Sequence, residues 1–306
     1  MAAPLARPTD NLGAISLIVA SMALFTLEDL SIKWLTATLP EGQIMVMFAA
    51  LGVALFAVLA LAQRRAIFAA RNWRPLPLVR AALEGVGAAA FLVAVARADL
   101  TLITAIFMVM PIVATMGAAL FLGEQVGLVR WSAVAVGFVG VLIILRPGLG
   151  AVEPAALWVL VSVGAIAARD LLTRVMDTEV PPPVVSAQAY LASLAAGAMM
   201  LAGTEAPTRL PTPSEAALVV AGVSVGALGY LAIVTAMRRG EPSVVAPLRY
   251  TRLVFTLLAG VVVLGERPDA ATLIGSALVV GAGLVIALRE RARARRALKS
   301  ATPPLF

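Results

Sequence analysis

Residues 97–124 read RADLTLITAIFMVMPIVATMGAALFLGE, and residues 239–266 read RGEPSVVAPLRYTRLVFTLLAGVVVLGE. Each stretch opens with Arg, an acid and a small hydroxyl residue, continues as an apolar run, and ends in Leu-Gly-Glu. The two copies are 142 residues apart. Near the start of each half a further match has an offset of 141, and it aligns segment 28–33 with segment 169–174. One nearly constant offset indicates that the chain is an internal duplication.

The composition predicts that both halves lie in a membrane. The 306 residues are 61% hydrophobic and 13% charged, whereas soluble domains are about 45–50% apolar and about 25% charged. The apolar runs suit helices of about 20 residues, and they lack the alternation of barrel strands. Ten spans are predicted: 12–35, 43–61, 76–95, 100–122, 126–145, 155–176, 184–202, 216–237, 243–264 and 270–288.

Five spans per half is an odd number, so the second half enters the membrane from the opposite side. We therefore predict an all-α integral membrane protein, with ten transmembrane helices in two inverted five-helix repeats around a central cavity. The repeats are predicted at 12–145 and 153–288, followed by a basic cytoplasmic tail at 289–306. Inverted repeats are typical of secondary transporters. The alternative functions outside transport by alternating access are a passive channel and a membrane scaffold.

The distribution of charge predicts the orientation. The chain has 24 Lys and Arg residues against 17 acids, a net charge of +7. With the N-terminus inside, most basic residues fall in cytoplasmic segments, which places both termini in the cytoplasm. We expect a multi-pass protein of a bacterial inner membrane, with a eukaryotic organelle as the alternative. The bilayer accounts for the basic excess, so no nucleic acid is expected as a partner.

Missing residue types exclude several kinds of chemistry. The chain contains no Cys and no His, so disulfides and thiolate metal sites are excluded, and proton-linked chemistry must use carboxylates. No phosphate-binding GxxxxGK[ST] loop occurs. Without a recognisable Ser/Lys or paired-Asp motif, the chain is not expected to be an enzyme. No cofactor, no metal and no obligate protein partner is expected.

The repeated motifs resemble those of a known family. Leu-Gly-Glu closes the fourth helix of each half, Asp99 to Thr101 matches Glu241 to Ser243, and Pro111 lies within the first of these helices. In these features the chain is similar to the drug/metabolite transporter superfamily, EamA type, and to its bacterial amino-acid exporters, including the aromatic type. The resemblance implies export of small metabolites through a cavity lined mainly by the third, fourth, eighth and ninth helices.

The second half departs from the first at the kink position. Pro111 is expected to kink its helix, but Leu253 occupies the corresponding place and Pro247 lies nearer the helix start. The two halves therefore need not bend alike.

We accordingly predict a secondary active exporter of amino acids, aromatic or apolar, that works by alternating access. Cationic drugs, nucleosides or other metabolites on the same fold are the alternative cargo. A proton is the candidate coupling ion.

Charged residues within spans are functional candidates because they are costly in lipid. Arg249 and Arg252 share a helix face. Either can bind a substrate carboxylate, form an ion pair with Glu84 or Asp170, or extend its charged end to the cytoplasmic surface. Glu84 can bind an ammonium group or a proton, or pair with Arg80 four residues earlier.

Other side chains complete the predicted site. Tyr230, Tyr250 and Thr251 are candidates for contact with the substrate, through a ring or a hydroxyl. The charged positions that match between the halves are candidates for gates or structural ion pairs, with Asp29–Lys33 and Asp170–Arg174 spaced for pairing within one helix. These positions are Glu28, Asp29, Lys33, Arg169, Asp170 and Arg174.

Two further features are interpreted as structural. Glu124 and Glu266 follow glycines at helix ends, where a carboxylate can cap the free N–H groups of the next helix. Gly222, Gly226 and Gly229 mark one face of a span and predict close helix packing, with room for a cavity as the alternative.

Overall fold

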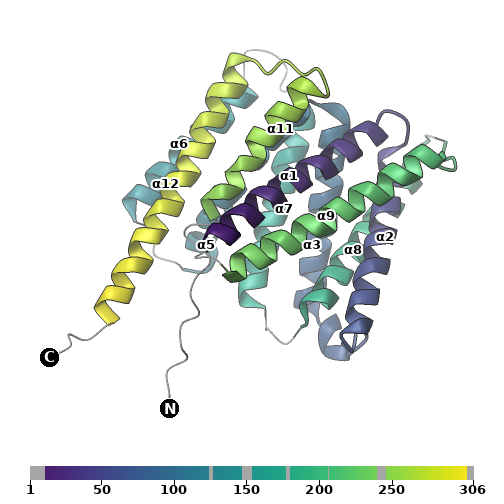
Figure 1. Ribbon diagram of the computed structural model, residues 1–306, viewed down its shortest axis with the longest axis horizontal. Coiled ribbons are helices and arrows are strands. Elements are labelled where there is room, and N and C mark those ends of the chain that lie inside the picture. The colour runs from purple at the N-terminus through teal and green to yellow at the C-terminus, as the bar shows by residue number, and fades with distance from the viewer. Residues whose placement is uncertain are drawn as a thin grey trace.

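The computed structural model describes residues 11–123, 127–146, 154–176, 180–205, 207–239 and 246–301 (Figure 1). The first half contains α1 (Asn11–Leu35), α2 (Glu41–Ala62), η1 (Ala70–Trp73), α3 (Pro75–Arg97), α4 (Leu100–Phe107), α5 (Met110–Phe121) and α6 (Leu128–Leu145). The second half contains α7 (Pro154–Val175), α8 (Pro182–Ala202), α9 (Pro213–Arg239), η2 (Ala246–Tyr250), α11 (Thr251–Val262) and α12 (Ala270–Ala301).

The all-helical membrane fold is confirmed. In the described ranges, eight helical stretches are long and apolar enough to cross a membrane, and the α4–α5 pair counts as one of them. The shorter apolar helix α6 and the pair of η2 with α11 complete the ten predicted spans. The last helix continues to Ala301, past the predicted end at 288. Its Arg- and Ala-rich extension contains strong helix formers and no Gly or Pro to end the helix.

The principal helix contacts join one half of the chain to the other. α1 packs on α9, α2 on α8, α3 on α7, and α6 on α12, and Figure 1 shows the first and last of these pairs side by side. The paired helices run antiparallel, as α1 and α9 show: Ser21 meets Gly229, and Ser31, later in α1, meets Gly222, earlier in α9. Pairing α1 with α9 and α3 with α7 is the symmetry that an inverted repeat requires.

Glycines bring these helices close together. A Cβ on Gly42 of α2 would lie 2.8 Å from the backbone nitrogen of Leu201 in α8. On α9, the expected close packing is confirmed, because Gly226 and Gly229 face side chains of α1, and Gly222 faces Phe48 of α2 and Ser31 of α1. The symmetry is not complete, however: α3 also packs extensively on α8, whereas the related pair α9 and α2 makes few contacts. α9 therefore packs less extensively on α2 than α3 does on α8.

The fourth span of each half is interrupted at the same repeat position. α4 ends at Phe107 and α5 begins at Met110, so the expected kink at Pro111 is a break, with Pro111 as the second residue of α5. In the second half, η2 ends at Tyr250 and α11 begins at Thr251. The offset of 142 places this junction on the α4–α5 break. Both halves thus change their helical geometry at this position, through a two-residue turn in the first half and a 3-10-to-α junction in the second, although only the first has a proline there.

The Leu-Gly-Glu motif ends these spans with a left-handed glycine. Gly123 has φ +67° and Gly265 has φ +70°, values that a residue without a Cβ adopts without strain. Glu266 then accepts hydrogen bonds from the N–H groups of Leu100 (2.6 Å) and Thr101 (3.0 Å) at the start of α4. The expected cap is present, but on the helix of the other half rather than on the next helix. Glu124 lies outside the described residues.

Candidate functional site

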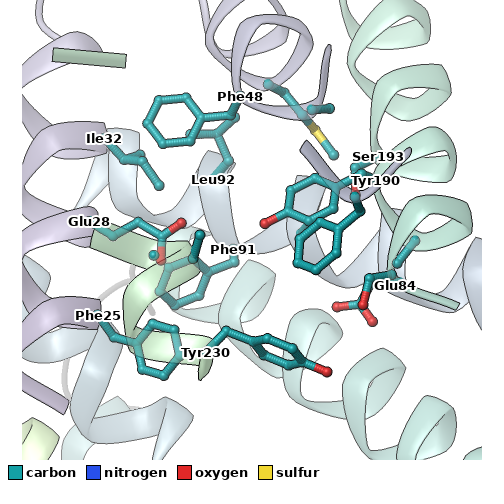
Figure 2. A pocket seen from close by; sticks show the side chains of 18 of the residues that line it. Phe25, Glu28, Ile32, Phe48, Glu84, Phe91, Leu92, Tyr190, Ser193 and Tyr230 are labelled. Atoms are coloured by element: carbon teal, nitrogen blue, oxygen red, sulfur yellow. The ribbon is translucent and has the colours of Figure 1, made fainter. Parts of the chain in front are cut away.

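A cavity between the helices is lined by six aromatic rings. This aromatic cavity has a volume of about 360 Å³ and lies among α1, α2, α3, α8 and α9, with one residue from α7. Ligand pockets in proteins are typically about 300–1,000 Å³. Figure 2 shows the side chains that converge on the space. The six rings are Phe25, Phe48, Phe56, Phe91, Tyr190 and Tyr230.

Three of the rings contact one another by stacking and edge-to-face packing. Phe56 is stacked with Tyr190 at 5.5 Å between ring centroids and meets Tyr230 edge-on at 6.1 Å. Both tyrosines come from the second half and Phe56 from the first, so the cluster is assembled across the repeat interface. Such a lining suits a planar apolar group, because aromatic surfaces favour offset-stacked and edge-to-face contacts.

Two carboxylates enter the aromatic cavity, and Figure 2 shows them on opposite sides of the ring cluster. Glu28 of α1 lies over Gly226 of α9, where a Cβ would overlap its carboxylate. Glu84 of α3 accepts hydrogen bonds at both oxygens from Arg169 Nη1 of α7, each 2.7 Å long. Arg80 is farther from Glu84, with Nη2 and Oε2 separated by 3.8 Å. The expected Arg80–Glu84 pair is therefore secondary to a pair between the halves.

Arg169 also binds its neighbour in the chain. Its Nε and Nη2 donate to Asp170 Oδ1 at 3.0 and 2.6 Å. Asp170 lines the second cavity, so this guanidinium connects a carboxylate of one cavity to a carboxylate of the other. The predicted Asp170–Arg174 pair is not tested, because the side chain of Arg174 lies outside the described part of the structure.

The second cavity lies where the two fourth spans break. This arginine cavity has a volume of about 280 Å³ and is lined by the break residues of both halves together with α1, α7 and α12. Its charged and hydroxyl-bearing residues are Thr115, Asp170, Arg249, Tyr250 and Arg252. The single central cavity expected from the sequence is thus divided in two, with Phe25 lining both parts.

Arg252 does not pair with Glu84 or Asp170, the partners considered from sequence. Its Nη2 donates to Asp29 Oδ2 of α1 at 2.6 Å. The guanidinium carbon lies 5.6 Å from the ring centroid of Phe25 and 5.8 Å from that of Phe107, within cation–π range. The cation is therefore held on three sides by the protein itself.

The expected Asp29–Lys33 pair is wrong, since Asp29 is bonded to Arg252. Lys33 Nζ instead donates to the carbonyl oxygens of Val95 (2.8 Å) and Ala98 (2.7 Å) at the end of α3. The physical reason is that the last carbonyls of a helix lack partners within the helix, and a cation there also opposes the negative end of the helix dipole.

The remaining predicted residues are divided between the cavities. Tyr230 lines the aromatic cavity, while Arg249 and Tyr250 line the arginine cavity. The Tyr250 hydroxyl is buried without a hydrogen-bond partner among the described residues. Thr251 does not reach either cavity; its hydroxyl donates to the Leu248 carbonyl at 2.6 Å.

Sequence reasoning missed Tyr190 and the phenylalanines of the ring cluster. The chain has only three tyrosines, and all three line the two cavities. That scarcity was the available signal for Tyr190. The ten phenylalanines carry no such signal, because a phenylalanine in a span suits lipid contact as well as a cavity.

Comparison with known proteins identifies a transporter family for both halves of the chain. The family model described as the EamA-like transporter family matches residues 12–146 and 153–288. A riboflavin transporter of Rhizobium johnstonii is 29% identical over 93% of both chains. A pseudopaline exporter of Pseudomonas aeruginosa is 26% identical over 91% of this chain and 97% of its own.

Two further comparisons extend the picture. An S-adenosylmethionine uptake transporter of Rickettsia bellii is 27% identical over 63% of this chain and 66% of its own. A solved crystal structure, 20% identical, superposes with a TM-score of 0.62 over 92% of this chain and 99% of that one, and so shares the fold.

Proposed function

Because the chain belongs to the EamA-like transporter family and is therefore a small-molecule transporter, we propose that its cargo is a planar aromatic metabolite of the riboflavin type. The cargo binds in the aromatic cavity between the two halves. The observation that carries this proposal is the cluster of six rings around a space of about 360 Å³. The similarity to a riboflavin transporter over 93% of the chain supports it.

The position of the cavity suits alternating access. Its lining comes from both halves, so a rocking motion of one half against the other changes the side from which the cavity is reached. The Glu84–Arg169 bond also joins the halves at the cavity wall. This bond must lengthen or rearrange if α3 and α7 move apart during transport.

The test is transport of riboflavin by the purified protein in liposomes. We expect saturable movement of riboflavin, inhibited by other planar aromatic compounds and insensitive to an aliphatic amino acid. Tyr190→Leu and Phe91→Leu remove rings from the cavity and are each expected to reduce transport about two- to tenfold, because stacking contributes about 0.5–1.5 kcal/mol beyond burial.

The matched control is Phe138→Leu on α6. Phe138 is 60% exposed on the outside of the bundle and lines neither cavity, so transport should be unchanged. If the cavity variants transport riboflavin at the wild-type rate, or if riboflavin does not move while the protein is folded, the proposal is wrong.

Amino-acid export is the second candidate function. It is favoured by Arg249, whose side chain lines the arginine cavity together with Asp170 and the Tyr250 hydroxyl, which has no partner in the part of the chain that the structure describes. An amino acid presents a carboxylate to the one charge and an ammonium to the other. Saturable export of labelled phenylalanine that Arg249→Gln abolishes would support this candidate over riboflavin.

Export is also the direction of transport that we propose. Liposomes in which all protein molecules have one orientation test it, because they show from which side the cargo is released.

A further inference from the structure

The two acids of the aromatic cavity differ in how their charge is compensated. Around Glu84, the guanidinium groups of Arg80 and Arg169 oppose the carboxylates of Glu84 and Asp170, which makes two cations against two anions. Glu28 has no such partner: no cation or hydrogen-bond donor among the described residues bonds to its carboxylate. The guanidinium of the nearby Arg252 is bonded to Asp29.

The internal repeat explains this difference. The offset of 141 relates Glu28 to Arg169, and the offset of 142 relates Glu84 to Gly226. The contact of Glu28 with Gly226 between α1 and α9 is therefore the counterpart of the contact of Arg169 with Glu84 between α3 and α7. One copy of the site holds a closed ion pair. The other copy holds an acid packed directly against a glycine, which has no side chain that could pair with it.

An uncompensated carboxylate within a membrane span is costly and marks a functional position. The Glu28 side chain lines the cavity beside Phe25 and Phe91, so a ligand within the ring cluster lies within its reach (Figure 2). A ligand that carries a hydrogen-bond donor or a positive charge would give the Glu28 carboxylate the partner that the described residues do not provide. A carboxylate on the ligand would instead meet like charge.

We propose that Glu28 selects the cargo, by binding a protonated amine or an N–H edge of a planar aromatic substrate on the side of its carboxylate that faces the aromatic cavity. This inference rests on the proposed function and narrows the substrate class to aromatic compounds with a nitrogen donor. An aromatic carboxylate of the same size is excluded from the site.

The test compares two probes that share an indole ring and a two-carbon side chain. Tryptamine ends in an ammonium group and indole-3-propionate ends in a carboxylate. Binding to the purified protein is measured by calorimetry, with riboflavin as a neutral planar probe. We expect the wild type to bind tryptamine at least about tenfold more tightly than indole-3-propionate, because hydrogen bonds to charged groups are the strong ones.

Two variants test the assignment to this carboxylate. Glu28→Gln removes the charge and should abolish the preference for tryptamine. Gly226→Ala places a methyl group against the Glu28 carboxylate and should weaken tryptamine binding several-fold. The control is Gly164→Ala on α7, where an added Cβ has nothing within 4 Å, and its affinities should match those of the wild type.

The outcomes separate this inference from the proposed function. If tryptamine is still preferred in Glu28→Gln, or if Gly226→Ala binds it as the wild type does, the role of Glu28 is wrong. If riboflavin binds while the wild type does not distinguish the two indoles, the inference fails and the proposed function stands. If none of the three probes binds to folded wild-type protein, the proposed function itself fails.

Discussion

At the scale of single residues, the bond between Asp29 and Arg252 changes the interpretation of both. Each is costly within a span when alone, and each neutralises the other across the interface of α1 and α11. The side chain of Asp29 is 4% exposed and that of Arg252 is 16% exposed, so water screens the pair only weakly. Removing one partner leaves the other as an uncompensated buried charge.

We predict that Arg252→Gln lowers the free energy of unfolding by about 3–5 kcal/mol, the cost of breaking a buried pair on one side. The double variant Arg252→Gln with Asp29→Asn should recover most of that loss. Thermal unfolding in detergent measures both. A double variant no more stable than Arg252→Gln alone would contradict the pairing, and a double variant that is stable but does not transport would show a further role for the charges.

Glu266 is a second residue whose role is structural. Its carboxylate is buried and accepts hydrogen bonds from the first two N–H groups of α4. We predict that Glu266→Ala costs about 1–3 kcal/mol of stability, because it leaves those donors unsatisfied. Glu266→Gln should cost less, since the amide oxygen still accepts one bond. Melting temperatures of the purified variants are the measurement.

The control for Glu266 is Glu41→Ala. Glu41 forms a 3.5 Å pair with Arg97, whose side chain is 54% exposed, and exposed pairs contribute about 0–1 kcal/mol. If both alanine variants melt at the same temperature, the cap does not stabilise the fold as the structure indicates.

At the scale of elements, the broken fourth spans show that packing, and not proline alone, sets the interruption. Pro111 occupies the second position of α5, where its missing N–H costs no intrahelical bond. The second half breaks at the equivalent place with Leu253 in the proline position. In both halves the break forms the wall of the arginine cavity.

We therefore predict that Pro111→Ala keeps the break and changes the free energy of unfolding by less than about 1 kcal/mol, since the ring only restricts the unfolded chain there. Transport should remain above half of the wild-type rate. As a positive control, Ala133→Pro in the interior of α6 should cost about 3 kcal/mol or more. A Pro111→Ala variant as unstable as Ala133→Pro would show that the proline itself holds the break.

At the scale of the whole molecule, the two halves are interleaved rather than placed side by side. Each of the principal helix pairs takes one helix from each half. The aromatic cavity therefore depends on how closely helices of different halves approach. The α2–α8 contact is one of the tightest, since Gly42 meets the backbone of α8.

We predict that Gly42→Ala lowers stability by about 1–3 kcal/mol, the usual cost of overpacking. Gly281→Ala should be neutral or stabilising by up to about 1 kcal/mol, because an added Cβ there has open space and alanine favours the helix. Unfolding temperatures of the two variants provide the comparison. Equal effects at both glycines would mean that close approach of the halves does not limit stability.

The sequence by itself determined the membrane location, the ten helices, the inverted duplication and the family. These follow from local properties: apolar runs of span length, Gly and Pro at the helix ends, and motifs repeated at a constant offset. It also identified most of the charged residues at the two cavities, because a charge in an apolar span stands out.

Only the tertiary structure decided which charged side chains form ion pairs with one another. Asp29 bonds to Arg252, 223 residues away, rather than to Lys33 on its own helix, and Glu84 bonds mainly to Arg169 rather than to Arg80. Helical spacing shows which neighbours are in reach, but an ion pair in a low-dielectric interior forms where packing brings the partners together. The ring cluster depends on packing in the same way, because its members come from several helices of both halves.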